Sequence, residues 1–465
     1  MIFPTSPQCI HGTDYEDIII TEQASRIEEG RSRMLNRERR HLIVPAVLLG
    51  LLTGSVSAGF QLSLDYGESM RNLAIDWAHQ QPSYGFWAIM GLSISAVFLS
   101  AGLAIQFSPE ASGGGIPHLK AVLKYRCTFR WFRVLVVKFI STLIGGSAGL
   151  MVGSGGPTVH MGGAIGQGIT NLWPDKTIKK RSVMVAAGGG AGLTAAFNSP
   201  LAGLVFTLEE LDSRCTSFEF FTAAIACLTA DTVCRVLLGQ NPTFHIAITG
   251  TPTLNLLAAF LPLGILSGIL GGLFNKSLLA AQKLIGLTAY PRLAWWLVLA
   301  AMVAAVSWFA PELLGGGRGF INSIFEGKAL TLNAIVLFFG IRLIVTVGSS
   351  SSGASGGIFM PILVLGALLG LGFGDILGRL LPDVDVDLKL FAVVGMAAYF
   401  TGVVQAPLTG IVLIIEMTGN YMMILPLFVA CFSAQTRADW MGIPPIYDAL
   451  MDIDLNKGAS ETHNL

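Results

Sequence analysis

The sequence carries few charged residues for its length. Lys, Arg, Asp and Glu make up 12% of its 465 residues, about half of the share usual in soluble proteins. The two signs balance at 29 residues each, so composition gives no reason to expect nucleic acid as a partner. Hydrophobic residues account for 52%, which argues against an ordinary soluble enzyme. We predict an all-α protein that crosses the membrane several times.

Cysteine is also scarce and shows no pattern. The spacing fits neither a disulfide framework nor a metal site, and we interpret the cysteines as small apolar residues or free thiols. The six are Cys9, Cys127, Cys215, Cys227, Cys234 and Cys431. We expect no metal, no cofactor, no catalytic activity and no secretory signal peptide.

Positive charge gathers in short segments between long apolar runs. The polar start of the chain ends in RSRMLNRERR, which holds five arginines, and positively charged loops stay in the cytoplasm. We therefore predict a cytoplasmic N-terminal region (1–41), a membrane domain in two repeats (42–240 and 241–450) and a short cytoplasmic tail (451–465). A tail this short favours a multi-pass protein of the bacterial inner membrane, with both termini in the cytoplasm.

Two distant segments of the chain match each other. VMVAAGGGAGLTAAFNSPLAGLVFTLEE (183–210) aligns without a gap with LFAVVGMAAYFTGVVQAPLTGIVLIIEM (390–417). The alignment places Pro200 on Pro407, and it also pairs flanking Gly and Glu residues. This agreement indicates an internal duplication, which membrane transporters often arrange as an inverted repeat.

Glycine and proline interrupt the apolar runs at four places. The interruptions are SGGGIP (112–117), GSGGPTV (153–159), SGASGGIFMP (352–361) and QAPLTG (405–410). Each precedes an apolar run, as at the start of a short helix whose first N–H groups carry partial positive charge. One such segment is explained by close helix packing. Four in repeat-related positions favour a midplane anion site that lacks a full positive charge and so lets the anion leave.

These segments resemble the signature stretches of the CLC family of chloride channels and chloride/proton antiporters. The resemblance rests on GGGIP, GSGGPTVHMG, SGASGGIFMP, PPIYDAL, NSPLAGLVFTLEE and APLTGIVLIIEMTGNY, and it runs over residues 42–450. It implies a homodimer with an inverted-repeat fold, in which broken half-helices meet at a midplane chloride site, and a possible proton relay at Glu210. The implied chloride-binding positions are Gly114, Gly115, Ser154, Gly155, Gly156, Ile358, Phe359, Met360 and Tyr447.

Two positions depart from the family pattern. The family carries a glutamate that plugs the outer path and shuttles protons where this sequence has Gly155, and a serine where it has Gly114. Without the carboxylate, nothing at this position competes with chloride or exchanges a proton with the outside. Without the hydroxyl, Tyr447 is the remaining inner barrier. We predict passive, channel-like conduction of chloride, with bromide and nitrate also permeating. The alternative is a chloride/proton antiporter with altered coupling.

Several acidic residues and one histidine within the apolar runs have competing interpretations. Carboxylates inside a membrane are functional candidates by default, but we interpret Glu209 and Glu416 as buried partners of helix termini. Glu210 is interpreted as structural or vestigial, because its partner at position 155 is absent. His160 could replace the missing proton carrier, but its different face on the helix favours a packing role.

Three cations and one serine complete the candidates. Lys138 and Arg342 either raise the local potential for anions or pair with a carboxylate, and the sequence leaves both open. Lys120 stands where relatives often carry an acidic residue, which could alter the cytoplasmic mouth. GGSAG (145–149) fits a hydrolase pattern, so a remote alternative is an intramembrane hydrolase with Ser147 as nucleophile and His160 as base. Close helix packing explains this segment better.

Overall fold

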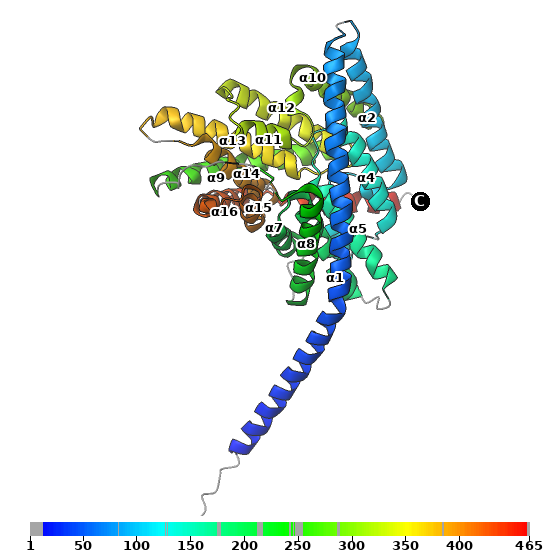
Figure 1. The fold of residues 1–465 in the computed structure, drawn as a ribbon, viewed down its shortest axis with the longest axis vertical. Helices are drawn as coiled ribbons and strands as arrows, with labels where there is room; N and C mark the ends of the chain where they lie inside the picture. The colour runs from blue at the N-terminus through cyan, green and yellow to red at the C-terminus, as the bar shows by residue number, and fades with distance from the viewer. Residues whose placement is uncertain are drawn as a thin grey trace, which may run out of the picture. The chain divides into compact units, whose positions relative to one another are not determined.

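The computed structural model describes residues 13–462, apart from 82, 126, 128, 174–177, 212–216, 241–242, 245, 247–253, 286–288 and 384–385. The chain divides into two units, Met1–Pro45 and Ala46–Leu465. The described part of the first unit is helical and belongs to the start of helix α1. The second unit holds the remaining helices, and the fold is described for this unit (Figure 1).

Helices make up most of the described chain, and no element of the described residues is a strand. The α-helices are α1 (Thr13–His79), α2 (Gly85–Phe107), α3 (Ile116–Leu123), α4 (Trp131–Ser147), α5 (Gly155–Leu172), α6 (Ile178–Phe197), α7 (Pro200–Phe206), α8 (Ser217–Leu238), α9 (Leu254–Ile285), α10 (Ala289–Phe309), α11 (Arg318–Phe325), α12 (Leu332–Ser351), α13 (Phe359–Leu380), α14 (Leu388–Val404), α15 (Pro407–Thr418), α16 (Ile424–Trp440) and α17 (Ile446–Thr462). Short 3₁₀ turns are η1 (Pro109–Ala111), η3 (Pro311–Leu313) and η4 (Tyr421–Met423), and η2 (Thr207–Leu211) is a π-helix.

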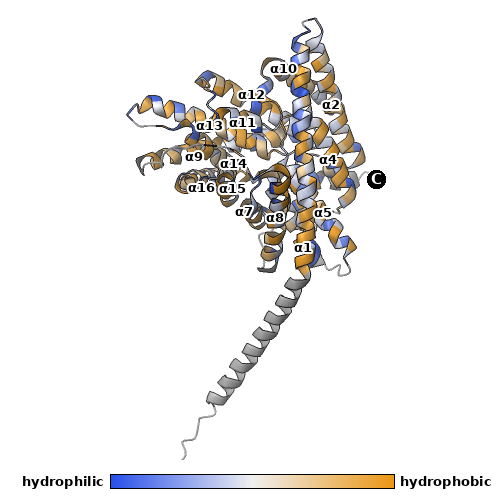
Figure 2. Ribbon diagram, in the orientation of Figure 1, coloured by the Kyte–Doolittle hydropathy of each residue, from blue (hydrophilic) through white to orange (hydrophobic). Residues whose placement is uncertain are grey.

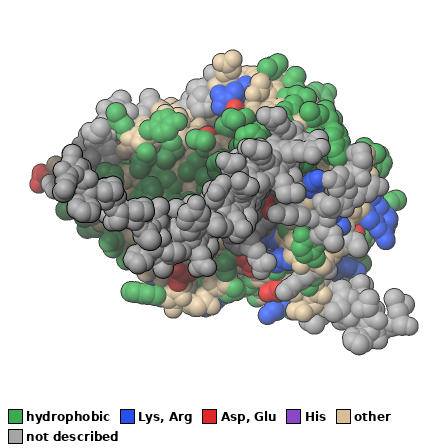
Figure 3. Space-filling view, turned by 90° about the horizontal axis from the view of Figure 1, so that it is seen from below, with side chains coloured by type: hydrophobic (Ala, Val, Ile, Leu, Met, Phe, Trp, Pro, Cys, Tyr) green, Lys and Arg blue, Asp and Glu red, His purple; other side chains and the backbone are tan. Residues whose placement is uncertain are grey.

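Many of these helices are apolar along their whole length. Within the described chain, seven are long and apolar enough to span a membrane. Figure 2 shows the helices of the second unit mostly in the hydrophobic colour, with polar residues toward helix ends. In Figure 3, hydrophobic side chains cover much of the described surface, and charged ones gather in small groups. The expected polytopic all-α membrane protein is therefore what the structure shows.

The order of elements repeats along the chain, and the repeat is longer than the alignment of 183–210 with 390–417 indicated. The series from α2 through η1 to α8 recurs as the series from α10 through η3 to α16. The turns before α3 and α11 also match, as FSPEASGGG (107–115) and FAPELLGGG (309–317). Gly115 and Gly317 precede the two eight-residue helices with φ of 88° and 89°, a left-handed conformation that suits glycine. The borders predicted for the two repeats stay a prediction.

Glycines allow the central helices of both repeats to approach closely. A Cβ atom at Gly162 of α5 would overlap the carbonyl oxygen of Gly188 on α6. In the second repeat, a Cβ at Gly366 of α13 would lie 2.5 Å from the carbonyl oxygen of Gly395 on α14. Small residues at such contacts let helices pack backbone to backbone inside a membrane. The close pairs α5–α6 and α13–α14 therefore hold the N-terminal ends of α5 and α13 in position.

Candidate anion site

Three of the four Gly-rich interruptions lie side by side at the beginnings of α3, α5 and α13. Gly153 donates its N–H to Gly357 O over 2.6 Å, and Gly357 donates back to Gly153 O over 2.9 Å. Gly356 donates to Gly113 O over 2.9 Å, and Gly113 donates to Ala354 O over 3.2 Å. The four backbone hydrogen bonds connect segments about 200 and about 240 residues apart into one unit.

Side chains are excluded from the centre of this unit. A Cβ atom at Gly156 would lie 2.7 Å from Gly114 O, and one at Gly357 would lie 2.7 Å from Gly156 N. At Gly114, by contrast, the nearest atoms to an added Cβ are 3.8 Å away. Glycine is therefore required at 156 and 357 by contact distance, whereas crowding does not explain the glycine at 114.

Gly155 is the first residue of α5, and it lies against two phenylalanine side chains. A Cβ at this position would lie 2.8 Å from the ring of Phe197 and 3.4 Å from Cβ of Phe359. The ring of Phe359, the first residue of α13, is 5.0 Å from that of Phe197 and 4.7 Å from that of Phe400. Phe197 and Phe400 were not among the predicted site residues, because nothing in their local sequence links them to Gly155.

The other predicted chloride-binding residues lie at helix beginnings. Ser154 and Ile358 are the N-cap residues of α5 and α13, and Gly115 occupies the same position on α3. Tyr447 lies in the first turn of α17 and is 2% exposed. Its hydroxyl has no hydrogen-bond partner among the described residues. An unsatisfied buried hydroxyl is costly without a ligand or water, which suits an anion-binding role.

The two repeat-related glutamates each bind the start of a helix in the opposite repeat. Glu209 accepts hydrogen bonds from the N–H groups of Leu408 (3.0 Å) and Thr409 (2.6 Å) at the start of α15. Glu416 accepts from Leu201 (3.1 Å) and Ala202 (2.8 Å) at the start of α7. Carboxylates satisfy the free N–H groups and the partial positive charge there. The interpretation of both as partners of helix termini is confirmed, but the two side chains are half-buried and not buried as expected.

Lys138 and Arg342 bind backbone carbonyl groups. Lys138 donates to Ala111 O (2.9 Å) and Gly113 O (2.6 Å), directly before Gly114. Arg342 donates to three carbonyl oxygens within 313–316, the matching turn of the second repeat. Both side chains are buried, and each holds one of the two turns that precede a short helix. The sequence left open that these two side chains pair with carboxylates. The structure shows that both are bound by carbonyl groups instead.

His160 is buried between α3 and the segment that precedes α4. Its Nε2 lies 3.0 Å from Nδ1 of His118, and its ring stacks on Phe129 at 5.4 Å. These contacts confirm a packing role, and they add a histidine pair that the sequence analysis missed. The hydrogen bond that the hydrolase alternative requires is not formed, because Ser147 Oγ has no partner among the described residues.

Lys120 lies between two carboxylates. Its Nζ is 2.6 Å from Oε1 of Glu210 and 2.8 Å from Oδ2 of Asp448. Burial would raise the pKa of Asp448, but hydrogen bonds and charge from Lys120 and Lys124 outweigh burial and lower it. The interpretation of Glu210 as structural is consistent with this ion pair.

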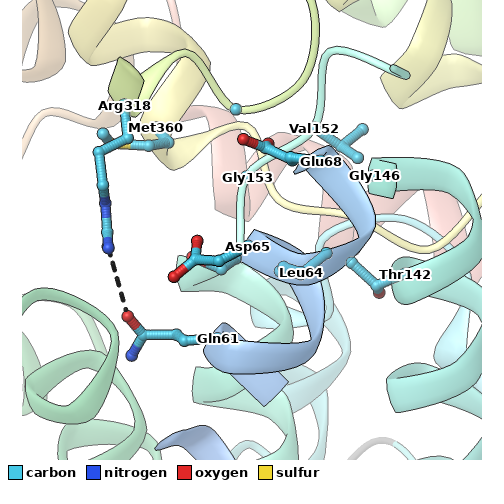
Figure 4. A pocket seen from close by; sticks show the side chains of 12 residues that line it. Gln61, Leu64, Asp65, Glu68, Thr142, Gly146, Val152, Gly153, Arg318 and Met360 are labelled. Carbon is cyan, nitrogen blue, oxygen red and sulfur yellow. Dashed lines mark hydrogen bonds between the residues drawn. The ribbon is translucent and has the colours of Figure 1, made fainter. Parts of the chain in front are cut away.

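A cavity of about 50 Å³ opens beside the start of α5 (Figure 4). Ser154 and Met360 line it together with Asp65 and Glu68 of α1 and Arg318 of α11. In Figure 4, Asp65 and Glu68 project from α1 toward Arg318. Arg318 donates to Gln61 Oε1 over 3.4 Å and to Ala196 O over 3.2 Å. Gln61 and Arg318 also line a second cavity of about 200 Å³, which Phe197 lines as well.

This charged group beside Ser154 was not among the site residues predicted from the sequence. FAPELLGGG, the turn before Arg318, matches FSPEASGGG in the first repeat. We identify no other signal for Arg318 in the sequence. Of the six cysteines, Cys127, Cys227, Cys234 and Cys431 are free thiols as expected. Cys9 and Cys215 lie outside the described residues.

The chain is similar to known chloride channels and transporters over most of its length. A family model described as voltage gated chloride channel matches residues 96–439. The H⁺/Cl⁻ exchange transporter ClcA of Vibrio parahaemolyticus is 35% identical, covering 88% of this chain and 89% of the relative. ClcA of Salmonella arizonae is 32% identical over 95% of both chains.

Solved structures agree with this family assignment. A slow cyanobacterial Cl⁻/H⁺ antiporter superposes with a TM-score of 0.85 at 31% identity, covering 90% of this chain and 98% of the other. A eukaryotic CLC transporter, at 22% identity and a TM-score of 0.75, supports the fold. The chain therefore belongs to the CLC family of anion transport proteins and has its all-helical, inverted-repeat membrane fold.

Proposed function

We propose that the chain carries chloride across the membrane down its gradient by passive, channel-like conduction. The proposed route, called the chloride pathway below, passes the starts of α5 and α13 and the hydroxyl of Tyr447. The observation that carries the passive form is Gly155, because the first residue of α5 has no side chain to bind a proton or to compete with chloride. Backbone N–H groups and helix dipoles attract an anion without holding it as a full charge would.

The contacts of Glu210 support the same proposal. A proton relay must release and rebind its proton during transport. The Glu210 carboxylate is buried and forms an ion pair with the Lys120 ammonium group, with 2.6 Å between Oε1 and Nζ. A proton passing through Glu210 would have to break this ion pair, and Gly155 offers no second carboxylate to receive the proton.

Chloride/proton exchange with altered coupling is the second candidate, and the comparisons favour it over passive conduction. The relatives from Vibrio and Salmonella are named H⁺/Cl⁻ exchange transporters, and the cyanobacterial structure is called a Cl⁻/H⁺ antiporter. One feature of this chain also supports it, since Asp65 and Glu68 line a cavity together with Ser154, next to Gly155. Protons would then have to use a route that avoids position 155.

The remaining expectations are part of the proposal. We propose a homodimer in the bacterial inner membrane with both termini in the cytoplasm. Glycine at 114 offers the anion no side-chain contact, so bromide and nitrate should permeate along with chloride.

Paired flux measurements distinguish the two candidates. The purified protein is placed in liposomes loaded with chloride, and the release of chloride and the movement of protons are recorded together. We expect chloride efflux without proton counterflow, and similar efflux of bromide and nitrate. Proton movement against its gradient, in fixed ratio to chloride, would reject passive conduction and establish exchange.

A further inference from the structure

Lys120 joins three parts of the chain that are far apart in sequence. It lies on α3, while its two partners, Glu210 and Asp448, lie on the π-helix η2 and on α17. Lys124, the C-cap residue of α3, also contacts Asp448, with 3.1 Å between Nζ and Oδ1. Three helices therefore meet at one ammonium group.

The two lysines differ in their exposure to solvent. The side chains of Lys120 and Glu210 are each 6% exposed, whereas those of Asp448 and Lys124 are 35% and 47% exposed. Exposed ion pairs contribute little, because water and salt screen them. Loss of one partner from a buried pair leaves an uncompensated charge and is costly. The position of α17 should therefore depend on Lys120 far more than on Lys124.

The residue next to Asp448 is Tyr447. Both lie in the first turn of α17, so a shift of Asp448 away from α3 would also move Tyr447. The Tyr447 hydroxyl is buried and has no partner among the described residues, and Glu210 lies within electrostatic range of it. Lys120 thus contacts the residue that follows Tyr447 and the carboxylate that acts on it.

Glu210 is itself well anchored. It belongs to a π-helix, an irregular form that occurs frequently at functional sites. The preceding Glu209 binds the start of α15 in the other repeat. One side of the Lys120 network is therefore fixed, and Asp448 connects that side to the first turn of α17.

We propose that Lys120 is a latch, a positioning residue that holds the first turn of α17 against α3 and so sets how far Tyr447 closes its end of the chloride pathway. The latch rests on the proposed passage of chloride past Tyr447. It does not depend on whether protons are exchanged.

Four variants test the latch in liposomes. Asp448→Asn removes the charge that Lys120 holds on α17 and leaves the Lys120–Glu210 pair in place. Lys124→Met is the matched control, because it removes the exposed partner of the same carboxylate. Chloride efflux should rise about three- to tenfold in Asp448→Asn and Lys120→Met, and stay within about twofold in Lys124→Met. Lys120→Arg should keep the original rate.

The same change in a Tyr447→Ala background separates the latch from a general structural role. If Lys120 acts through Tyr447, Asp448→Asn should change efflux by less than about twofold once the tyrosine is absent. An equal factor in both backgrounds would overturn the proposal. The proposal would also be overturned if chloride efflux fell in Asp448→Asn, or if it equalled the efflux of Lys124→Met.

A measurement that does not involve chloride tests the latch separately from the proposed function. Met451, one turn after Tyr447 on α17, is 3% exposed. We expect a Met451→Cys protein to react with a water-soluble maleimide several times faster when Asp448 is Asn than when Lys124 is Met. The reaction of the protein without this cysteine is subtracted. Equal labelling would reject the latch, whereas an unmodified protein that releases no chloride would reject only the proposed function.

Discussion

The two ends of the proposed chloride pathway are closed in different ways. At the Gly155 end, the first residue of α5 has no side chain, and it lies against the ring of Phe197 and the Cβ of Phe359. At the Tyr447 end, a buried tyrosine is followed directly by Asp448, whose carboxylate is bound by two lysines. Apolar packing covers one end, and an ion-pair network positions the other. Substitutions at the two ends should therefore act in opposite directions.

The largest effect is expected from a carboxylate at the Gly155 end. A Gly155→Glu side chain would displace the ring of Phe197, since even a Cβ would lie 2.8 Å from it. Its charge would compete with chloride at the start of α5. We expect chloride efflux from liposomes to fall by about tenfold or more.

The matched control at this position is Gly155→Ala. It adds the Cβ without the charge, so its effect separates crowding by Phe197 from competition by the carboxylate. Unchanged efflux in Gly155→Glu would show that position 155 is not on the chloride pathway.

A smaller effect is expected from the charged cavity beside Ser154. Arg318→Met removes the guanidinium group from this cavity, which Asp65 and Glu68 also line. Attraction of chloride should weaken, and efflux should fall about two- to threefold at low ionic strength and less at high ionic strength, because salt screens the attraction. Lys328→Met is the control, since this exposed lysine pairs with Glu312 and does not line the cavity. A loss independent of salt would point to a structural role for Arg318.

The smallest effect is expected from pH at the Tyr447 end. Burial would raise the pKa of Asp448, but hydrogen bonds and charge from Lys120 and Lys124 outweigh burial and hold that pKa below its usual range. A carboxyl group with a lowered pKa loses its contribution only when the pH falls through that pKa. The ratio of efflux between Asp448→Asn and unmodified protein should therefore stay constant from about pH 8 to about pH 5. A ratio that approaches one within this range would show that Asp448 is not held as a charged partner.

The sequence predicted more of the fold than of the site. Apolar runs, Gly-rich interruptions and the match of 183–210 with 390–417 led to the inverted-repeat membrane fold that the comparisons confirm. The match of 107–115 with 309–317 was equally visible in the sequence and was missed. The comparisons favour exchange over the passive conduction predicted from Gly155 and Gly114, and the flux experiment decides between them.

The residues in the membrane interior show where sequence reasoning ends. Glu209 and Glu416 were expected at helix termini, but only the structure shows that each binds the start of a helix in the opposite repeat. Lys138 and Arg342 were left between two interpretations, and the structure assigns both to backbone carbonyl groups. Partner choice depends on distances between helices, which local sequence does not encode.

By itself, the sequence determined the membrane environment, the helical class, the duplication, the family resemblance and the missing side chain at Gly155. These follow from composition and from the order of residues along the chain. Only the tertiary structure decided that Phe197 lies over Gly155 and that Lys120 binds Glu210 and Asp448, which are 90 and 328 residues away. Such contacts form only once the helices have packed, because burial then requires each charge to find a partner at short range.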